Sequence, residues 1–519
     1  MPLPPPVVRA VALACALSLL PWPAAAQVRL PDLGESAAED FNVATERRLG
    51  DQIMAELRRD PDYLDDPVLL DELQALWQPL VRAARQRGEV SPDTDARFAW
   101  EAFLVRDRAV NAFALPGGYV GVHLGLIAIA QSRDELAAVL GHELSHVTQR
   151  HIARSIANSK RQSVAGLAAL ILGALVASRA RSADGLGAVI TGSQAAVAQG
   201  QLNFSRDMER EADRIGTRVM ADAGFSPAGV ATMFEKLEQA FRLNDSQNYP
   251  YLRSHPLTTE RIGEARARAG QGDVPPQSSP LAHAAMQARA RVLMEPSVQA
   301  LRRWQSLDAG PRPGGDGERF AALFASALAS SRLREHGRAQ QAAATAADIA
   351  GREAARDGGR AERAVKRLQA ELALARGDGE AALSLLAMAD DREHPRSQLL
   401  MKAEATRVAA RQGKAEPAAL EASGNALRDW LIGQPADAGA WASLAQTAEL
   451  RGQPVLSVRA DAEARAALGD YGGAVDRLRA AQRLLQGPAA ADFIEASVVD
   501  ARLRQLEAQR RAMATAQRP

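Results

Sequence analysis

Hydrophobic residues in the first part of the chain recur with two different periods. Near residues 46–57 and across 67–87 they recur every three to four positions, which predicts two amphipathic helices. The segment RFAWEAFLVRD at 97–107 instead alternates between apolar and polar residues, as a half-buried β-strand does. Two more β-like runs lie in AVNAFALPGGYVGV at 109–122, and the Pro-Gly-Gly between them predicts a tight turn.

Two helices are predicted to follow these β-like runs. LGLIAIA at 124–130 is short and apolar throughout. Ser132 and Glu135 form a capping box, so a longer helix is expected over 133–150. The apolar flanks of this longer helix indicate that it is buried, and histidines inside it therefore need polar partners.

The most apolar stretch after the N-terminus is VAGLAALILGALVA at 164–177. Its 14 residues are fewer than the roughly 20 needed to span a bilayer. Together with the Gly/Ala-rich segment at 183–200, it forms either a pair of buried helices or a mobile flap or surface-dipping hairpin over a nearby site, and both interpretations stay open. As a flap, the segment would make at most peripheral contact with a membrane.

Beyond two breaks rich in Pro and Gly, at 270–280 and 311–317, the chain becomes almost entirely Ala-rich helix. Glycines recur there at intervals of 40, 36 and 39 residues, at Gly337, Gly377, Gly413 and Gly452. Segments such as WASLAQTAELRG resemble one helix of a tetratricopeptide repeat. Stacked helix pairs of this kind bury a continuous core and present a face to other proteins, although a non-repetitive bundle remains an alternative.

Composition narrows the class of protein. Aromatic residues are only 4% of the chain, which favours helices over sheets. The 63 basic and 62 acidic residues nearly cancel, so no basic excess points to nucleic acid. We therefore expect a mainly α protein that does not bind nucleic acid.

The N-terminal residues have the layout of a secretory signal peptide. Arg9 precedes the apolar run AVALACALSLL, and the following PWPAAA ends in small residues, which predicts cleavage near Ala26. Cys15, the only cysteine, lies within this segment. A metal site in the mature chain must then use histidine and carboxylate ligands.

The helix expected at 133–150 contains the spacing H-E-x-x-H. His142 and His146 are four residues apart, so they project from the same helical face and can hold one ion. Glu143 can take a proton from a nearby water. Gln149 and Ile152 stand where a metzincin would have Gly and His, so that class is rejected.

The third ligand must come from elsewhere. Glu209 and Asp213 lie four residues apart in a downstream helical segment and share a face, so Glu209 can ligate while Asp213 orients an imidazole. Glu211 points roughly the other way and is a poor ligand. We interpret His151 as a histidine that supports a ligand or the fold. An ordinary amphipathic helix with a solvated acidic face is the alternative.

Three ordered motifs carry a family resemblance over about residues 40–265. H-E-x-x-H, then E-x-x-x-D, with NAFALPGG upstream, is similar to the gluzincin family that includes HtpX, the CAAX prenyl endopeptidases and the periplasmic BepA-like proteases. SHPLTTERI near the end of this region also fits. The signal peptide and the helical repeats favour the BepA-like branch.

The resemblance implies roles for individual residues. It makes His142, His146 and Glu209 the ligands of one Zn²⁺ per chain, Glu143 the general base and Asp213 the partner of a ligand.

The resemblance also assigns residues around the metal. Arg261 would stabilise the oxyanion, and His255 would either do the same or occupy the fourth zinc position and keep the enzyme latent. An extended substrate would pair with an edge strand formed by Asn111, Ala112, Phe113 and Ala114.

These observations predict an α+β zincin-like metallopeptidase domain followed by an all-α tetratricopeptide-repeat solenoid. The expected divisions are a signal peptide at 1–26, the metallopeptidase domain at 27–269, a linker with a helical segment at 270–317 and the repeat domain at 318–515.

The predicted function is that of a periplasmic zinc endopeptidase. Its substrates would be misfolded or stalled envelope proteins, and its repeats would dock it to clients or to the outer-membrane assembly machinery. The alternative is a non-catalytic, repeat-based chaperone or scaffold with a structural zinc site. The sequence does not identify the substrate, the docking partner or the oligomeric state.

Overall fold

The computed structural model describes residues 41–158, 205–243, 249–269, 280–309, 315–389, 395–486 and 493–516. The expected signal peptide at 1–26 and the apolar segment at 164–177 lie outside the described residues.

A four-stranded sheet has the order β1-β2-β4-β3. Its strands are β1 (Tyr63–Leu64), β2 (Glu101–Val105), β3 (Ala112–Leu115) and β4 (Tyr119–His123). β2 and β4 run parallel, whereas β1 and β3 pair with their neighbours antiparallel. The predicted turn joins β3 to β4, and Gly117 and Gly118 adopt φ of 79° and 89° there, which favours glycine. β3 is therefore an edge strand.

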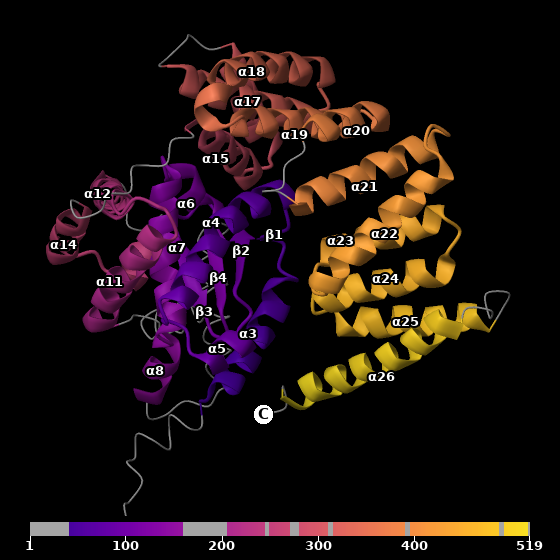
Figure 1. Cartoon of the computed structure of the whole chain (residues 1–519), viewed down its shortest axis with the longest axis horizontal. Coiled ribbons are helices and arrows are strands. Elements are labelled where there is room, and N and C mark those ends of the chain that lie inside the picture. Colours follow the sequence, from indigo (N-terminus) through magenta and orange to yellow (C-terminus); the bar gives the residue numbers. More distant parts are fainter. Residues whose placement is uncertain are drawn as a thin grey trace, which may run out of the picture. The chain divides into compact units, whose positions relative to one another are not determined.

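The helices that accompany this sheet are α3 (Val43–Leu57), α4 (Pro67–Gln86), α5 (Pro92–Arg97), α6 (Leu124–Ile129), α7 (Arg133–Thr148), α8 (His151–Asn158), α11 (Arg206–Asp222), α12 (Ala228–Leu243), α13 (Tyr251–Ser254) and α14 (Thr259–Ala269). The sheet lies among these helices (Figure 1), and a separate hydrophobic cluster packs on each of its faces. On one face Phe103 and Tyr119 pack with Ile53 of α3. On the other, Leu104 and Val120 belong to the core built with α4, α7, α11 and α12. Period-two alternation along the strands separates these two faces.

Two predicted elements are shorter in the structure. The helix expected over 133–150 ends at Thr148, because Arg150 adopts a φ of 50° and α8 begins at the next residue. The Arg150 side chain donates to Glu46 and to the Phe41 carbonyl, which holds this turn. The strand expected over 97–107 is limited to Glu101–Val105, since Trp100 has a φ of 52°.

Helices α7 and α11 cross in close contact at two glycines. A Cβ on Gly216 would lie 2.8 Å from the carbonyl group of Gly141, and one on Gly141 would lie 3.1 Å from the Gly216 oxygen. Any side chain at either position would push the helices apart. This close approach brings the ligand-bearing faces of α7 and α11 together.

Helices make up the rest of the described chain. They are α15 (Pro280–Met294), α16 (Val298–Gln305), η2 (Ser306–Asp308), α17 (Asp316–Arg332), α18 (His336–Asp357), α19 (Arg360–Ala375), α20 (Gly379–Met388), α21 (Pro395–Arg411), α22 (Pro417–Gly433), α23 (Ala438–Leu450), α24 (Pro454–Ala467), α25 (Tyr471–Leu485) and α26 (Phe493–Ala516). From α17 onward, consecutive helices pack side by side (Figure 1). The predicted fold class, mainly α with a small sheet and a helical repeat region, is confirmed.

Glycines join several of these helix pairs, as their spacing predicts. Gly377, Gly413 and Gly452 all have φ between 68° and 75°, the left-handed conformation that ends a helix. Gly337 differs, because it lies in the first turn of α18. Arg334, with a φ of 62°, makes the turn before that helix.

No helix among the described residues is both long enough and apolar enough to cross a membrane.

Candidate metal centre

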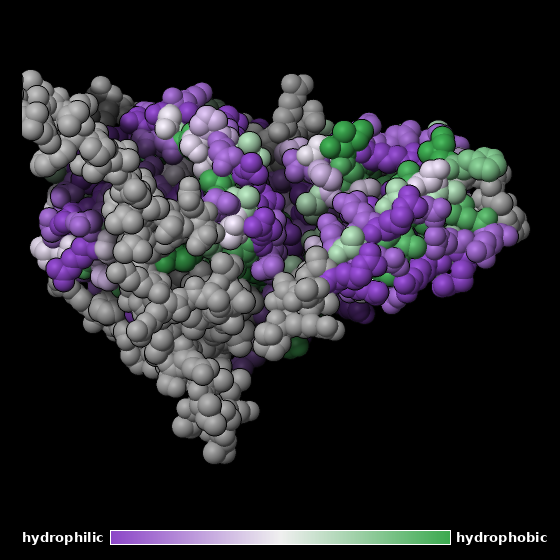
Figure 2. Space-filling view, turned by 90° about the horizontal axis from the view of Figure 1, so that it is seen from below, coloured by the Kyte–Doolittle hydropathy of each residue, from purple (hydrophilic) through white to green (hydrophobic). Residues whose placement is uncertain are grey.

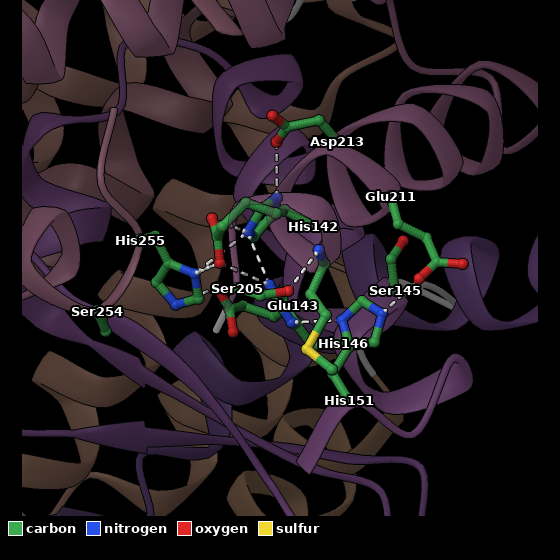
Figure 3. Close-up of polar contacts among 12 residues, drawn as sticks. His142, Glu143, Ser145, His146, His151, Ser205, Glu211, Asp213, Ser254 and His255 are labelled. Atoms are coloured by element: carbon green, nitrogen blue, oxygen red, sulfur yellow. Dashed lines mark hydrogen bonds and ion pairs between the residues drawn. The ribbon is translucent and has the colours of Figure 1, made fainter. Parts of the chain in front are cut away.

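Four side chains able to bind metal meet beside the crossing of α7 and α11 (Figure 3). His142 and His146 lie on α7, Glu209 lies on α11, and His255 directly follows α13. All four are buried, and their ligand atoms lie within 4.8 Å of one another. The three expected metal ligands are thus brought together, and His255 joins them.

The separations between these atoms fit one small cation. Nε2 of His142 lies 3.0 Å from Nε2 of His146 and 3.3 Å from Nδ1 of His255. The Glu209 carboxylate approaches all three imidazoles at 3.0–3.5 Å. A tetrahedral ion with bonds of about 2.0–2.1 Å holds its ligand atoms roughly 3.3 Å apart. The donor set and its spacing are therefore those of a metal site.

The second nitrogen of His142 is held by a carboxylate. Nδ1 of His142 lies 2.8 Å from Oδ1 of Asp213, the partner that the sequence predicts. Arg261 donates to both Asp213 oxygens, from Nε at 2.6 Å and from Nη2 at 2.9 Å. The same guanidinium pairs with Glu209 at 2.9 Å and donates to the Pro256 carbonyl. Arg261 therefore contacts the carboxylates of the metal centre, a different position from the expected contact with a substrate oxyanion.

The second nitrogen of His146 meets another histidine. Nδ1 of His151 lies 2.8 Å from Nδ1 of His146, and Nε2 of His151 lies 3.0 Å from Glu211. Arg154 also donates to Glu211, at 2.8 Å. A straight helix through 133–150 would not place His151 here. The turn at Arg150 does so, and a sequence pattern does not encode that left-handed residue.

Glu143 lies beside the cluster and is fully buried. Neither of its carboxylate oxygens makes a hydrogen bond to the described residues. Burial raises the pKa of Glu143, although the charges of His255 and His142 act against this change. Nε2 of His255 lies 3.4 Å from one of these oxygens. A buried carboxylate with so few hydrogen bonds is poised to accept a proton from a ligand or water that enters the site.

The pKa shifts of the cluster show that it stabilises positive charge. Burial lowers the pKa of His142, but hydrogen bonds with Asp213 and Glu209 outweigh burial and raise it to about 10. Burial raises the pKa of Glu209, yet the neighbouring His255 and His142 lower it overall. Burial and the charge of His142 hold the pKa of His146 well below its ordinary value. A bound cation would be stabilised by the same carboxylates, Glu209 and Asp213.

The strand expected to receive substrate lies next to α7, the helix that carries H-E-x-x-H. β3 is the edge strand, and α7 packs against it. The backbone amide of Ala114 approaches Glu143 closely enough to lower its pKa. Ala112 and Phe113 pair with β4, whereas Asn111 precedes the strand and leaves its buried Oδ1 without a partner among the described residues.

Sequence reasoning did not identify Tyr251. Its ring stacks on His255 with centroids 4.7 Å apart, and its buried hydroxyl has no hydrogen-bond partner among the described residues. Burial and the nearby carboxylate of Glu143 raise the pKa of this hydroxyl well above its ordinary value. Only its position four residues before His255 could have pointed to it.

An H-E-x-x-H helix, a second helix with E-x-x-x-D and an adjacent edge strand together define a metallopeptidase domain. Residues 72–269 match the model of peptidase family M48. The resemblance seen in the sequence is thereby confirmed.

Individual relatives agree with the family. The chain is 40% identical to a Vibrio cholerae protein over 252 residues, which cover 48% of this chain and 50% of that one. It is 35% identical to the beta-barrel assembly-enhancing protease of Escherichia coli (strain K12) over 242 residues, 47% of each chain. The mitochondrial metalloendopeptidase OMA1 of Schizosaccharomyces pombe is 33% identical over 185 residues, 36% of this chain and 51% of the relative. The matches span about half the length of these relatives.

Proposed function

We propose that this chain is a periplasmic zinc endopeptidase that hydrolyses peptide bonds of misfolded or stalled outer-membrane proteins. The observation that carries the proposal is the convergence of His142, His146 and Glu209 beside the fully buried carboxylate of Glu143. Two imidazoles and one carboxylate form the ligand set of a catalytic zinc site, with a carboxylate close by as general base.

His142, His146 and Glu209 would hold the zinc ion. When bound, zinc supplies Lewis-acid polarisation of the scissile carbonyl. Asp213 fixes the imidazole of His142 through Nδ1, and Arg261 holds Asp213 and Glu209 in place. We therefore assign Arg261 to the support of the ligands.

Glu143 performs the proton transfers in this proposal. It accepts a proton from the water that attacks the scissile carbonyl and delivers that proton to the leaving amine. An extended substrate would add to the outer edge of β3 by backbone hydrogen bonds, close to Ala114 and Glu143. Such pairing depends on the substrate's backbone more than on its side chains, so it would accept unfolded segments of varied sequence.

His255 would hold the enzyme in a latent state. Its Nδ1 lies 3.0 Å from Glu209 and 3.3 Å from His142, while its Nε2 lies 3.4 Å from Glu143. The ring thus occupies the space between the ligands and the general base, where water and substrate would react. His255 must move away before hydrolysis.

The helical repeat region would dock the peptidase to clients or to the outer-membrane assembly machinery. The name of the Escherichia coli relative supports a role in β-barrel assembly, and the signal-peptide pattern supports the periplasm. A chaperone-like contribution from the repeats belongs to the same proposal.

The first test replaces the general base. Glu143→Gln keeps the size of the side chain and leaves the metal ligands intact, so zinc content should equal that of the wild type. Casein hydrolysis by the purified chain should fall by about a hundredfold or more, because a general base contributes roughly 10²–10⁴ in rate. Hydrolysis at the wild-type rate would contradict the assigned role.

The second test concerns latency. His255→Ala removes the ring that occupies the reaction space, so casein hydrolysis or self-cleavage should rise. His283→Ala is the matched control. His283 is also buried, but it hydrogen-bonds the carbonyl of Ala130, the C-cap residue of α6. A loss of hydrolysis in His255→Ala would show that His255 serves the transition state instead.

A non-catalytic scaffold with a structural metal is the second candidate. The closed set of four donors favours it, because structural zinc sites have no open position. Incubation of His255→Ala with casein, with and without a chelator, separates the two candidates. Chelator-sensitive hydrolysis by this variant or by the wild type supports the enzyme, and its absence in both supports the scaffold.

A further inference from the structure

The two histidines of the H-E-x-x-H motif are supported in different ways. His142 meets the Asp213 carboxylate directly. His146 reaches a carboxylate only through a second imidazole, in the order His146, His151, Glu211. Figure 3 shows Asp213 beyond His142, and His151 with Glu211 beyond His146.

With Glu211 ionised and His151 neutral, the contacts between His146, His151 and Glu211 allow one arrangement of protons. An ionised Glu211 only accepts, so Nε2 of His151 must be the nitrogen that carries a hydrogen and donates to it. Nδ1 of a neutral His151 is then a bare acceptor. The hydrogen between the two rings must therefore belong to Nδ1 of His146. This leaves a lone pair on Nε2 of His146, the nitrogen that faces the cluster.

We propose that His151 and Glu211 are positioning residues that fix the tautomer and ring orientation of His146 for metal binding. The inference rests on the proposed function, because it assigns His146 as a zinc ligand. His151 is fully buried and cannot obtain these contacts from water. Glu211 is partly exposed, with 28% of its side chain accessible, so water replaces it in part and its contribution is smaller.

The turn at Arg150 makes this contact possible. Arg150 ends α7 in a left-handed conformation, and its guanidinium binds Glu46 of α3. His151 then opens α8 and lies back against His146. Arg154, one turn further along α8, binds Glu211 and holds the carboxylate toward His151.

Two substitutions at one position separate support of the ligand from mere packing. His151→Phe fills the space of the ring without an acceptor. His151→Asn retains an acceptor, because its amide oxygen is as many bonds from Cα as imidazole Nδ1. Zinc affinity of the purified full-length chain would be measured by competition with a chromophoric chelator. His151→Phe should bind zinc about ten- to a hundredfold more weakly, and His151→Asn should recover most of that loss.

Glu211→Gln tests the same arrangement at a position where misfolding is not expected. It should weaken zinc binding by a smaller factor than His151→Phe. Asp207→Asn is its matched control, because Asp207 is an exposed carboxylate in the first turn of the same helix and pairs with the surface side chain of Arg210. The control should bind zinc as the wild type does.

The outcomes distinguish this inference from the proposed function. Equal losses in His151→Phe and His151→Asn, or wild-type affinity in His151→Phe and Glu211→Gln, overturn the positioning role while zinc binding itself stands. Wild-type protein that binds zinc no better than His142→Ala overturns both.

Discussion

At the scale of single residues, the spacing of the motifs predicted which side chains share one face of a helix. His142 and His146 share a face because they are four residues apart, and the same holds for Glu209 and Asp213. Spacing could not place Arg261, because its contacts depend on how α14 packs near α11. The periodicity of a sequence predicts which residues share a helical face, whereas contacts between different helices can be read only from the folded structure.

A prediction at this scale concerns Arg261. Arg261→Lys keeps the charge but loses the planar fork that contacts Asp213, Glu209 and the Pro256 carbonyl together. Both carboxylates should become less well oriented, and zinc affinity should fall by about tenfold in a chelator competition. Arg266→Lys, an exposed arginine of the same helix paired with Glu235, should leave the affinity unchanged. Equal affinities for Arg261→Lys and the wild type would remove Arg261 from the support of the site.

At the scale of elements, the Ser132 cap of α7, the hairpin turn and three of the four repeating glycines agreed with their sequence signals. These signals are local, since each depends on the backbone conformation of a few residues. The crossing of α7 and α11 is different. Its glycines carry no turn or cap signal, and their role appears only when the two helices meet.

The crossing supplies the prediction at this scale. Gly216→Ala would place a Cβ 2.8 Å from backbone atoms of Gly141, so α7 and α11 must separate. The free energy of unfolding should fall by about 1–3 kcal/mol, as in overpacked cores, and zinc affinity should fall with it.

Gly263→Ala is the control for this prediction, since no atom lies within 4 Å of the added Cβ and the residue is within α14. Its free energy of unfolding should stay the same or rise by up to about 1 kcal/mol. Urea unfolding and chelator competition measure the two effects. Unchanged stability in Gly216→Ala would show that the helices do not need this close approach.

At the scale of the whole molecule, acidic residues at the start of α4 bind arginines from helices far along the chain. Arg289 of α15 donates to both oxygens of Asp66 at 2.7 Å and also pairs with Glu371 of α19. Arg396 of α21 pairs with Asp65 at 2.7 Å. The near-equal numbers of basic and acidic residues did not predict these ion pairs, because the net charge does not say which charged residues lie close together. Ion pairs thus connect the start of α4 with α15 and α21, and the pair between Asp66 and Arg289 is buried.

Elsewhere, the face shown in Figure 2 is mostly hydrophilic and interrupted by small hydrophobic patches. Large exposed apolar side chains among the described residues of the last helices include Ile432, Phe493 and Ile494.

The buried pair at Asp66 leads to a pH prediction. Burial raises the pKa of Asp66, but Arg289 and the amide of Leu69 lower it overall below its ordinary 3.8. A lowered folded-state pKa means that the stabilisation is complete above the unfolded pKa and is lost as pH falls through the folded one. Asp66→Asn should therefore unfold more easily at pH 7, by roughly 3 kcal/mol, and should depend less on pH in the acid range.

Urea unfolding at pH 7 and in the acid range measures this effect. Asp93→Asn serves as control, because Asp93 is exposed and pairs only with Arg97 on its own helix. It should follow the wild type at every pH. An acid dependence in Asp66→Asn as steep as that of the wild type would contradict the assignment.

The most direct test of the central claim is the zinc stoichiometry of the purified chain by elemental analysis. The wild type and Glu143→Gln should each carry about one zinc per chain, as a single tetrahedral site requires. Glu209→Ala should carry far less, because the carboxylate that completes the set with His142 and His146 is gone. Glu209→Ala with the zinc content of the wild type would contradict the account.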